Sequence, residues 1–254
     1  MIFLKFFIIT KRHLTIALTL ILGITIIGFG TFSYGAIAGS KRLVPIYSVE
    51  KDEKVVALSF DAAWGNEDTG ELIEILGKYN IKATFFVVGS WVDKYPESVK
   101  QLFDAGHSIE NHSNSHPHMP QLSVEGMTKE LESCNDKIEN VTGVRPTLFR
   151  APYGDYDNAM LNTVTGLNMY TIQWDVDSRD WKEDYTVDMI VKGVTENVKE
   201  GSIVLFHNAA KNTPKALPII IDKLIAEGYK FELISNLIYK DGYTIDHTGK
   251  QLKP

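Results

Sequence analysis

The chain has 254 residues, of which 44% are hydrophobic and 23% charged, a composition typical of one globular domain. Its net charge of -6 argues against a nucleic-acid partner, because such surfaces need clustered Lys and Arg to displace counterions from phosphates. Cys134 is the only cysteine, which excludes an intrachain disulfide.

The first 39 residues differ from the rest. No charged residue occurs from Leu14 to Gly39, basic residues precede this run, and Glu50 is the first acidic residue. About 20 apolar residues span a bilayer, and basic flanks favour the cytoplasmic side. We therefore expect a membrane anchor over 1–39, with the following domain outside the cytoplasm. The alternative is secretion after cleavage near Ala38, although signal peptides usually have a shorter apolar region.

Residues 40–54 read as a polar linker, 55–240 as the folded domain and 241–254 as a polar tail. Within the domain, short β-branched or aromatic runs alternate with helical periodicity, which predicts an α/β fold with a parallel sheet. Seven or eight such units predict a distorted (β/α) barrel. The predicted strands are Val55 to Phe60, Ala83 to Val88, His107 to Asn111, Thr147 to Arg150, Met169 to Trp174, Ser202 to Phe206 and Lys230 to Ile234.

Two helical stripes separate these strands. Leu72, Ile75, Leu76 and Tyr79 share one face of the first helix, and the stripe of a later helix is formed by Met127, Leu131, Cys134, Ile138 and Val141. Thr213 and Pro214 are expected to open the last long helix.

Chemically active residues cluster after the predicted strands. They are Asp61, His112, His116, Arg150, Asp177, Asp180 and His207. In parallel barrels the active site forms at the carboxyl ends of the strands, so this distribution predicts one catalytic rim. The His112/His116 pair has a spacing that suits one metal ion. Taken alone, the spacing of this pair supports a metal site less well than it supports the alternative, a polar surface loop that happens to be rich in histidine.

Five segments carry a family resemblance. They are SFDAAWG around Asp61, HSNSH, RAPYG from Arg150, DVDSRDW ending at Trp181, and IVLFH ending at His207. In this order they resemble the motifs of NodB-type polysaccharide deacetylases (carbohydrate esterase family 4), and the resemblance runs from Lys54 to about Tyr239. The first segment and the short anchor are most similar to the PdaB-like sporulation branch.

The resemblance implies roles for the residues of the rim. His112 and His116 would hold a divalent metal, with zinc the expected ion. Asp61 would be the general base, oriented by Arg150, and His207 the general acid, paired with Asp177. A backbone N–H near Tyr153 would meet the developing oxyanion, and Leu205 with Trp181 would receive the acetyl methyl group. The implied reaction is hydrolysis of N-acetyl groups on an extracytoplasmic glycan, with cell-wall peptidoglycan in sporulation the expected substrate.

One position departs from the family pattern. The family's first motif has two adjacent aspartates, the second a metal ligand, and Ala62 stands in that second position. Two histidines are one ligand short of the usual catalytic zinc site. This departure motivates an alternative hypothesis, a weakly active or inactive glycan-binding pseudoenzyme.

Overall fold

The computed structural model describes residues 42–254, and Leu43–Pro254 form a compact unit of their own. The predicted anchor over 1–39 and the alternative cleavage near Ala38 lie outside the described residues. Between residues 42 and 254, no helix is both long and apolar enough to cross a membrane.

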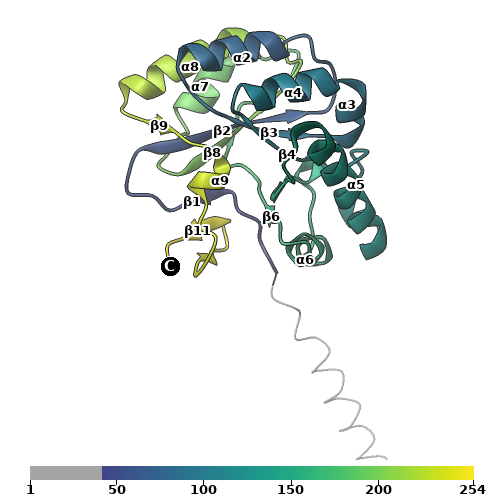
Figure 1. The fold of residues 1–254 in the computed structure, drawn as a ribbon. Helices are drawn as coiled ribbons and strands as arrows, with labels where there is room; N and C mark the ends of the chain where they lie inside the picture. Colours follow the sequence, from purple (N-terminus) through teal and green to yellow (C-terminus); the bar gives the residue numbers. More distant parts are fainter. Residues whose placement is uncertain (1–41) are drawn as a thin grey trace, which may run out of the picture. The chain divides into compact units, whose positions relative to one another are not determined.

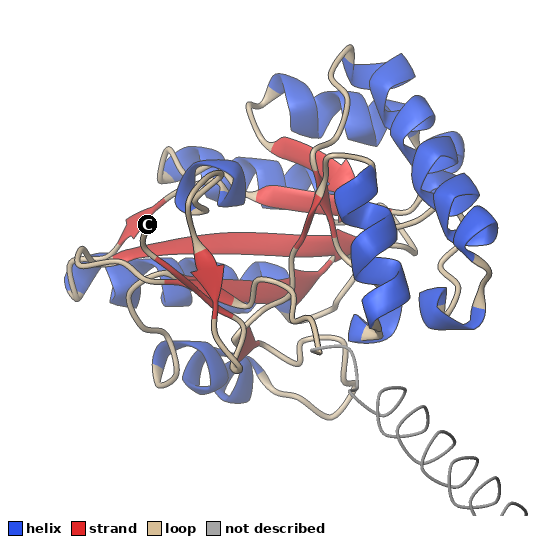
Figure 2. Ribbon diagram, turned by 90° about the horizontal axis from the view of Figure 1, so that it is seen from below, coloured by secondary structure: helices blue, strands red, loops and turns tan. Residues whose placement is uncertain are grey.

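A curled parallel sheet forms the centre of this unit (Figures 1 and 2). Its parallel strands lie in the order β7-β8-β2-β3-β4-β5-β6. Their bounds are β2 Val55–Ala62, β3 Thr84–Val87, β4 Ser108–Asn111, β5 Leu148–Phe149, β6 Tyr170–Thr171, β7 Val176–Asp177 and β8 Ser202–His207. The predicted parallel α/β sheet is confirmed. Within the described chain, the path of paired strands ends at β6, and beyond it only an isolated bridge joins Ile46 to Ile172. The sheet is therefore curled into a half-barrel.

Helices cover the outer face of this sheet (Figure 2). The longer ones are α2 Thr69–Lys78, α4 Pro96–Asp104, α5 Val124–Thr142, α6 Asn158–Gly166, α7 Val187–Thr195 and α8 Thr213–Ala226; shorter turns are α3 Gly89–Lys94, α9 Ile234–Leu237, η1 Met119–Gln121 and η2 Pro152–Gly154. The predicted stripe of α2 is confirmed by the burial of Leu72, Ile75 and Leu76. In α5, Met127, Leu131, Cys134 and Ile138 are likewise buried.

Strand β2 explains how the site is positioned. All eight of its residues are buried, as expected for a strand covered on both faces. Side chains alternate along a strand, so Phe60 and Ala62 pack in the cluster that includes the apolar side chains of α2 and α8. Ala57 packs instead in a second apolar cluster, which includes Phe86 and Ile172 on the inside of the curled sheet. Ser59 and Asp61 lie two and four residues further along β2, so their side chains point to the same face as Ala57. Asp61 therefore faces the inside of the curled sheet, and Ala62 faces the helices.

The predicted linker and tail are wrong as descriptions of residues 42–54 and 241–254. Strand β1 (Ser48–Val49) pairs with β8 and with β11 (Lys250–Leu252), which in turn pairs with β10 (Thr244–Ile245). Gln251 is fully buried, and its amide satisfies both backbone groups of Tyr239. Polarity alone suggested an extension, but a buried polar side chain is stable when its hydrogen bonds are made.

The predicted strand at Lys230 to Ile234 is shorter than expected. Of this predicted strand, only Lys230–Phe231 forms a strand (β9), which pairs with β2. Helix α9 begins at Ile234.

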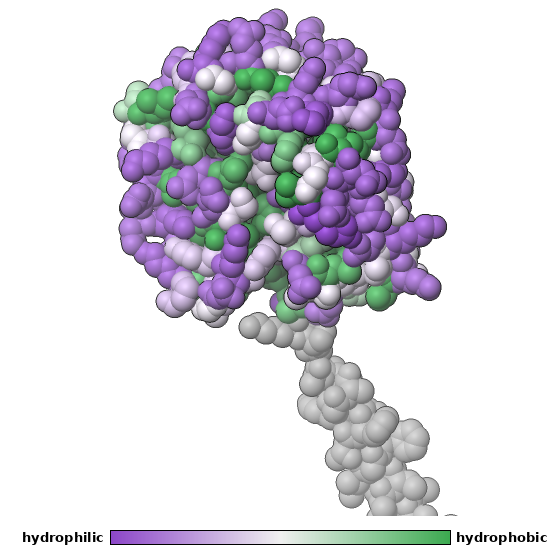
Figure 3. Space-filling view, viewed as in Figure 1, coloured by the Kyte–Doolittle hydropathy of each residue, from purple (hydrophilic) through white to green (hydrophobic). Residues whose placement is uncertain are grey.

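The surface shown in Figure 3 is mostly hydrophilic, with apolar side chains in small groups between polar ones. This is ordinary for a globular domain.

Candidate active site

A cavity of about 520 Å³ lies at the carboxyl ends of the central strands, where the sequence predicted a rim. It is lined by Asp61, Ala63, Trp64, His112, His116, Tyr153, Gly154, Trp174, Asp177, Trp181, Leu205 and His207. Nearly all the predicted site residues therefore meet in one cavity. Arg150 is fully buried behind it.

Asp61 and Arg150 form a buried ion pair at the floor of the cavity. Nη1 of Arg150 donates to Oδ1 of Asp61 at 2.8 Å, and its Nη2 donates to Ser59 Oγ at 2.9 Å. Burial alone would raise the pKa of Asp61, but Arg150 and the nearby His112 and His207 outweigh it and lower that pKa below its ordinary value. Asp61 is consequently a carboxylate, able to accept a proton.

His112 lies beside this pair with a fixed ring orientation. Its Nδ1 is 2.8 Å from the Arg150 carbonyl oxygen, which fixes the proton on Nδ1 and leaves Nε2 as an acceptor. That Nε2 lies 3.6 Å from Asp61 Oδ2. The rings of His112 and His116 are 5.0 Å apart between centroids. Both imidazoles therefore face the same cavity.

The loop that carries the two histidines is held by polar side chains from neighbouring elements. Asn111 accepts the Ser113 N–H at 2.7 Å, and Ser113 Oγ accepts the His116 N–H at 3.0 Å. From α5, Glu130 accepts the backbone N–H groups of Asn114 and Ser115. These hydrogen bonds hold the loop in one conformation. This is evidence against the alternative that the segment is an unconstrained polar surface loop.

Burial keeps both site histidines neutral. It is the largest effect on each ring and lowers the pKa of His112, and that of His116 to about 4. Neutral imidazoles are the form that binds metal. His107 differs, because its Nδ1 accepts the Ala83 N–H at 3.1 Å and it lines no part of the cavity. The histidine-rich stretch thus contains both structural and site histidines.

The donor set suits a divalent cation only in part. Two neutral imidazoles are present, but in residues 42–254 no group of three or more His, Cys, Asp or Glu side chains could hold a metal ion. Ala62 is 1% exposed and packs away from the cavity. Asp68, a nearby carboxylate in sequence, instead accepts the Ala209 N–H at 2.9 Å. The site thus provides two ligands, fewer than catalytic zinc usually has.

His207 has a carboxylate partner, but it is not the predicted one. Nδ1 of His207 lies 2.8 Å from Asp180 Oδ1, and Thr213 donates to Oδ2 of the same carboxylate at 2.6 Å. Asp177 lines the cavity and accepts the Arg179 N–H at 2.8 Å. Both aspartates follow the same predicted strand; the turn after β7 brings the second one to His207. Sequence spacing could not distinguish them.

The pKa of His207 reflects this partner. Burial is the largest effect and would lower the pKa, but the hydrogen bond and charge of Asp180, helped by Asp61 and Asp177, raise it above its ordinary value. His207 therefore carries a proton that it can donate near neutral pH. A carboxylate base and a protonated imidazole share one cavity, which is the arrangement that acid–base hydrolysis requires.

The predicted substrate-contacting residues lie around this pair. Leu205 is buried on β8 beneath the cavity, and Trp181 lies at its edge, 56% exposed. Tyr153 has a left-handed backbone, with φ of 61°, and its ring stands 4.7 Å from that of His116. Among the described residues its backbone N–H has no acceptor, so it is available to a ligand.

The sequence interpretation missed Trp64. Its indole is 59% exposed and lies 6.1 Å from the His116 ring and 6.5 Å from the His207 ring. Asn208 fixes the backbone on both sides, accepting the Ala63 N–H at 3.2 Å and donating to the Gly65 carbonyl. A large exposed apolar side chain on a rigid loop, next to two site histidines, is typical of a binding surface.

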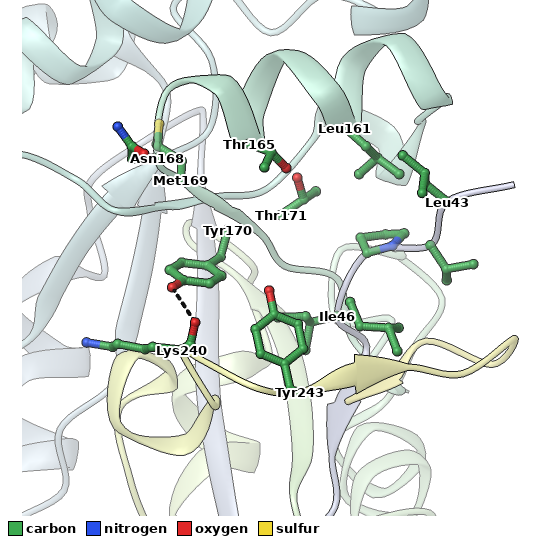
Figure 4. Close-up of a pocket in the computed structure, with 13 residues that line it drawn as sticks. Leu43, Ile46, Leu161, Thr165, Asn168, Met169, Tyr170, Thr171, Lys240 and Tyr243 are labelled. Carbon is green, nitrogen blue, oxygen red and sulfur yellow. Dashed lines mark hydrogen bonds between the residues drawn. The ribbon is translucent and has the colours of Figure 1, made fainter. Parts of the chain in front are cut away.

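A second cavity, shown in Figure 4, shares no lining residue with the catalytic cavity. It is enclosed by the segment from Leu43 to Ile46, by α6 and β6, and by residues near β10 such as Tyr243. Tyr170 there donates to the Lys240 carbonyl oxygen at 3.1 Å. Its lining contains no His, Asp, Glu or Cys, and its ionisable side chains are those of Tyr170, Lys240 and Tyr243.

Comparison with known proteins identifies relatives of this chain. Residues 48–172 match a family model described as polysaccharide deacetylase. The chain is 31% identical over 195 residues to the peptidoglycan-N-acetylmuramic acid deacetylase PdaA of Bacillus subtilis, covering 74% of this chain and 73% of that protein. It is 36% identical over 190 residues to PdaC of the same organism, a peptidoglycan-N-acetylmuramic acid deacetylase; the match covers 75% of this chain and 40% of PdaC.

Among solved structures, the chain is similar to a protein from Bacillus anthracis that is described as a CE4 family pseudoenzyme. The TM-score is 0.73 at 34% identity, with 81% of this chain and 69% of that chain covered. A mutant of that protein is described as having restored enzymatic activity, and the TM-score to it is 0.74 at 35% identity, over 81% of this chain and 72% of that chain.

Proposed function

Because this chain belongs to the polysaccharide deacetylase family, we propose that it hydrolyses N-acetyl groups on a cell-wall glycan, with peptidoglycan as the substrate. One observation carries this proposal. The carboxylate of Asp61 and the proton-bearing imidazole of His207 line the same cavity, and each is held by its own buried partner. A module that only binds glycan has no need of an acid and a base with pKa values moved in opposite directions.

The proposed reaction uses these two groups in sequence. Asp61 takes a proton from a water molecule as the water oxygen attacks the acetyl carbonyl carbon. His207 then donates its proton to the sugar nitrogen as the carbon–nitrogen bond breaks, which leaves acetate and a free amine. Arg150 holds the base in place and keeps it ionised between turnovers.

Other groups would stabilise the intermediate and the acyl group. The unpaired N–H of Tyr153 would donate to the oxyanion, as backbone donors do in acyl transfer. Leu205 and Trp181 would surround the acetyl methyl group in an apolar recess.

His112 and His116 would hold a divalent metal, zinc being the ion we propose. When bound, such an ion polarises the acetyl carbonyl and makes a bound water more acidic. With only two protein ligands, we expect weak affinity. The orientation of His112 by the Arg150 carbonyl and the low pKa of His116 support this assignment.

The setting of the reaction follows from the same family. The relatives PdaA and PdaC are named for action on peptidoglycan, a glycan outside the cytoplasm. Together with the apolar N-terminal run, this supports a domain tethered by one membrane helix on the outer side, in the sporulation setting suggested by the PdaB-like resemblance.

A glycan-binding pseudoenzyme is the second candidate. Ala62 removes a carboxylate ligand, and the B. anthracis protein that this chain is similar to is described as a pseudoenzyme. The complete Asp61, Arg150, Asp180 and His207 set argues for the enzyme.

Acetate release from N-acetylated peptidoglycan and chitin oligomers separates the two candidates. The full chain should release acetate with an added divalent metal, and Asp61→Asn and His207→Ala should each lower kcat by about 10² to 10⁴. Absence of acetate from every glycan with every divalent metal would overturn the enzyme proposal in favour of the binding module.

A further inference from the structure

Tyr153 has a backbone conformation that its residue type seldom adopts. Its φ of 61° lies in the left-handed region, where the Cβ atom of an L-residue comes close to the following carbonyl oxygen. Asn and Asp enter this region more often because their short polar side chains hydrogen-bond locally, which a tyrosine ring cannot do. Contacts with other parts of the chain must therefore hold Tyr153 in this conformation.

Hydrogen bonds fix the residues around Tyr153 but not Tyr153 itself. The Gly154 N–H donates to the Ala151 carbonyl oxygen at 3.1 Å, and the Gln173 side chain donates to the Gly154 carbonyl oxygen at 3.1 Å. Within residues 42–254, neither the N–H nor the hydroxyl group of Tyr153 has a hydrogen-bond partner. The packing of its ring is therefore what distinguishes the left-handed conformation from others.

The Tyr153 ring contacts two histidine rings. The His118 imidazole is stacked on it, with 4.1 Å between the ring centroids and an angle of 17° between the planes. The His116 ring meets it edge to face at 4.7 Å and 73°. Because Tyr153 is 62% exposed, much of its remaining surface faces solvent. The stacked His118 ring is thus its main face-to-face contact in the described chain.

His118 is itself oriented by the turn on which it packs. Its Nδ1 lies 3.3 Å from Oδ2 of Asp155, two residues after Tyr153. Both side chains are about half exposed, so the ion pair contributes little attraction of its own. Its effect is to direct the face of the imidazole onto the tyrosine ring. His118 therefore joins the segment after the HSNSH loop to the turn that contains Tyr153.

We infer that His118 is a positioning residue, which keeps the Tyr153 backbone left-handed and thereby directs the Tyr153 N–H toward the reacting carbonyl. The inference rests on the proposed function, in which this N–H stabilises the oxyanion. His118 does not line the catalytic cavity, whereas Tyr153 does, so His118 acts only through Tyr153. Without the stacked ring, Tyr153 relaxes toward an ordinary backbone conformation, and its N–H turns away.

Two substitutions separate the stacking from the other properties of His118. His118→Ala removes the ring, and His118→Phe keeps an aromatic face without the nitrogen atoms. His247→Ala, which removes an exposed histidine from the turn between β10 and β11, is the matched control.

NMR of the full chain with isotope-labelled tyrosine tests the conformation without requiring turnover. The backbone shifts and couplings of Tyr153 report its φ, and their loss in Tyr153→Phe identifies them. They should be left-handed in the parent chain, in His118→Phe and in His247→Ala, and should move toward ordinary values in His118→Ala. Left-handed values retained in His118→Ala overturn the inference.

Acetate release then tests the role in the reaction. In His118→Ala, kcat should fall roughly three- to tenfold, the change in population that loss of one aromatic pair allows. KM should change little, because the oxyanion exists in the transition state and not in the bound substrate. His118→Phe should restore most of kcat, and His247→Ala should not alter it. A loss that His118→Phe does not restore overturns the inference.

Two further outcomes keep the possible causes apart. A lower kcat accompanied by weaker zinc binding would act through His116, two residues away, and overturns the inference. A changed Tyr153 backbone with unchanged kcat supports the enzyme proposal and overturns the positioning role. A parent chain that releases no acetate overturns the enzyme proposal, and the NMR comparison then decides by itself whether His118 holds the Tyr153 backbone.

Discussion

Nδ1 of His207 lies 2.8 Å from Oδ1 of Asp180, and Oδ2 of the same carboxylate accepts the backbone N–H of His207 at 2.9 Å. Asp180 thus fixes both the ring and the backbone of the residue that ends β8. Because Asp180 is 4% exposed, its charge acts on the imidazole with little screening by water. This pairing raises the pKa of His207, and we expect it to contribute to the pH dependence of both stability and activity.

Asp180→Asn should lower the pKa of His207, since burial would then dominate over the remaining charges. The alkaline limb of the activity profile should move to lower pH. Titration of the His207 ring by NMR measures the shift directly. Asp177→Asn is the control and should shift this pKa less, because Asp177 acts only through space. Equal shifts in the two variants would contradict the assignment of Asp180 as the partner.

The same pair contributes to stability in a defined pH window. The pKa of His207 is raised on folding, so its contribution is complete below the ordinary value of 6.5 and is lost as pH rises through the raised value. Denaturant unfolding of the parent chain should show this loss above pH 6.5. Asp180→Asn should remove that slope; if the slope persists, another group is responsible.

The sequence predicted most of the rim and the pairing of Asp61 with Arg150, but it assigned the wrong carboxylate partner to His207. The ends of the strands can be predicted because each apolar run stops at a polar residue. Strand ends placed at these positions bring Asp61, His112, Arg150 and His207 together, as the structure shows. Choosing between Asp177 and Asp180 required the path of the turn after β7, which depends on tertiary packing. Trp64 was missed because an aromatic residue in a loop carries no periodic signal.

The fold, like the site, could be predicted from the sequence only in part. The parallel order of the strands follows from alternating strand and helix patterns. The short β10 and β11 did not, because they pair through backbone groups and a single buried amide, Gln251, within a polar sequence. Curling into a half-barrel is likewise a property of the assembled sheet.

Arg150→Met should raise the pKa of Asp61, because burial then acts without its strongest opposing charge. The acidic limb of the activity profile should move to higher pH. The unfolding free energy should fall by about 3–5 kcal/mol, since Asp61 is left buried without its partner. Denaturant titration measures this loss. The double variant Asp61→Asn/Arg150→Met should recover part of it, and purely additive losses would contradict coupling between the pair.

Ala62→Asp should lower the Tm of the metal-free chain and enlarge the rise in Tm caused by zinc. The position is 1% exposed within an apolar cluster, so an unpaired carboxylate there is costly. Because Ala62 packs on the helix side of β2, the aspartate side chain would have to turn toward the cavity to coordinate a metal alongside His112 and His116. That coordination would relieve the cost, since a ligand that binds only the folded state stabilises it. The same substitution combined with His112→Gln and His116→Gln is the control. A zinc-induced rise equal to that of the parent chain would show that this side chain does not reach the metal.

Trp64→Ala should weaken glycan binding roughly five- to tenfold, because the indole is the large exposed apolar surface between His116 and His207. Trp64→Phe should restore part of the affinity. Calorimetry with chitin oligomers measures both. Because the side chain is 59% exposed, the Tm should change little in either variant. Unchanged affinity in Trp64→Ala would remove this residue from the binding surface.

Gln251→Ala should destabilise the domain by about 2–4 kcal/mol, although the residue lies in a polar, C-terminal segment. Its Oε1 accepts the Tyr239 N–H at 2.8 Å and its Nε2 donates to the Tyr239 carbonyl at 2.7 Å. The substitution leaves both partly buried backbone groups without these partners, and an unsatisfied buried group costs about 1–3 kcal/mol. Thr248→Ala, in the exposed turn between β10 and β11, is the control and should cost less. Equal unfolding midpoints for Gln251→Ala and the parent chain would show that the last strand contributes nothing to the sheet, and would return residues 241–254 to the status of an extension.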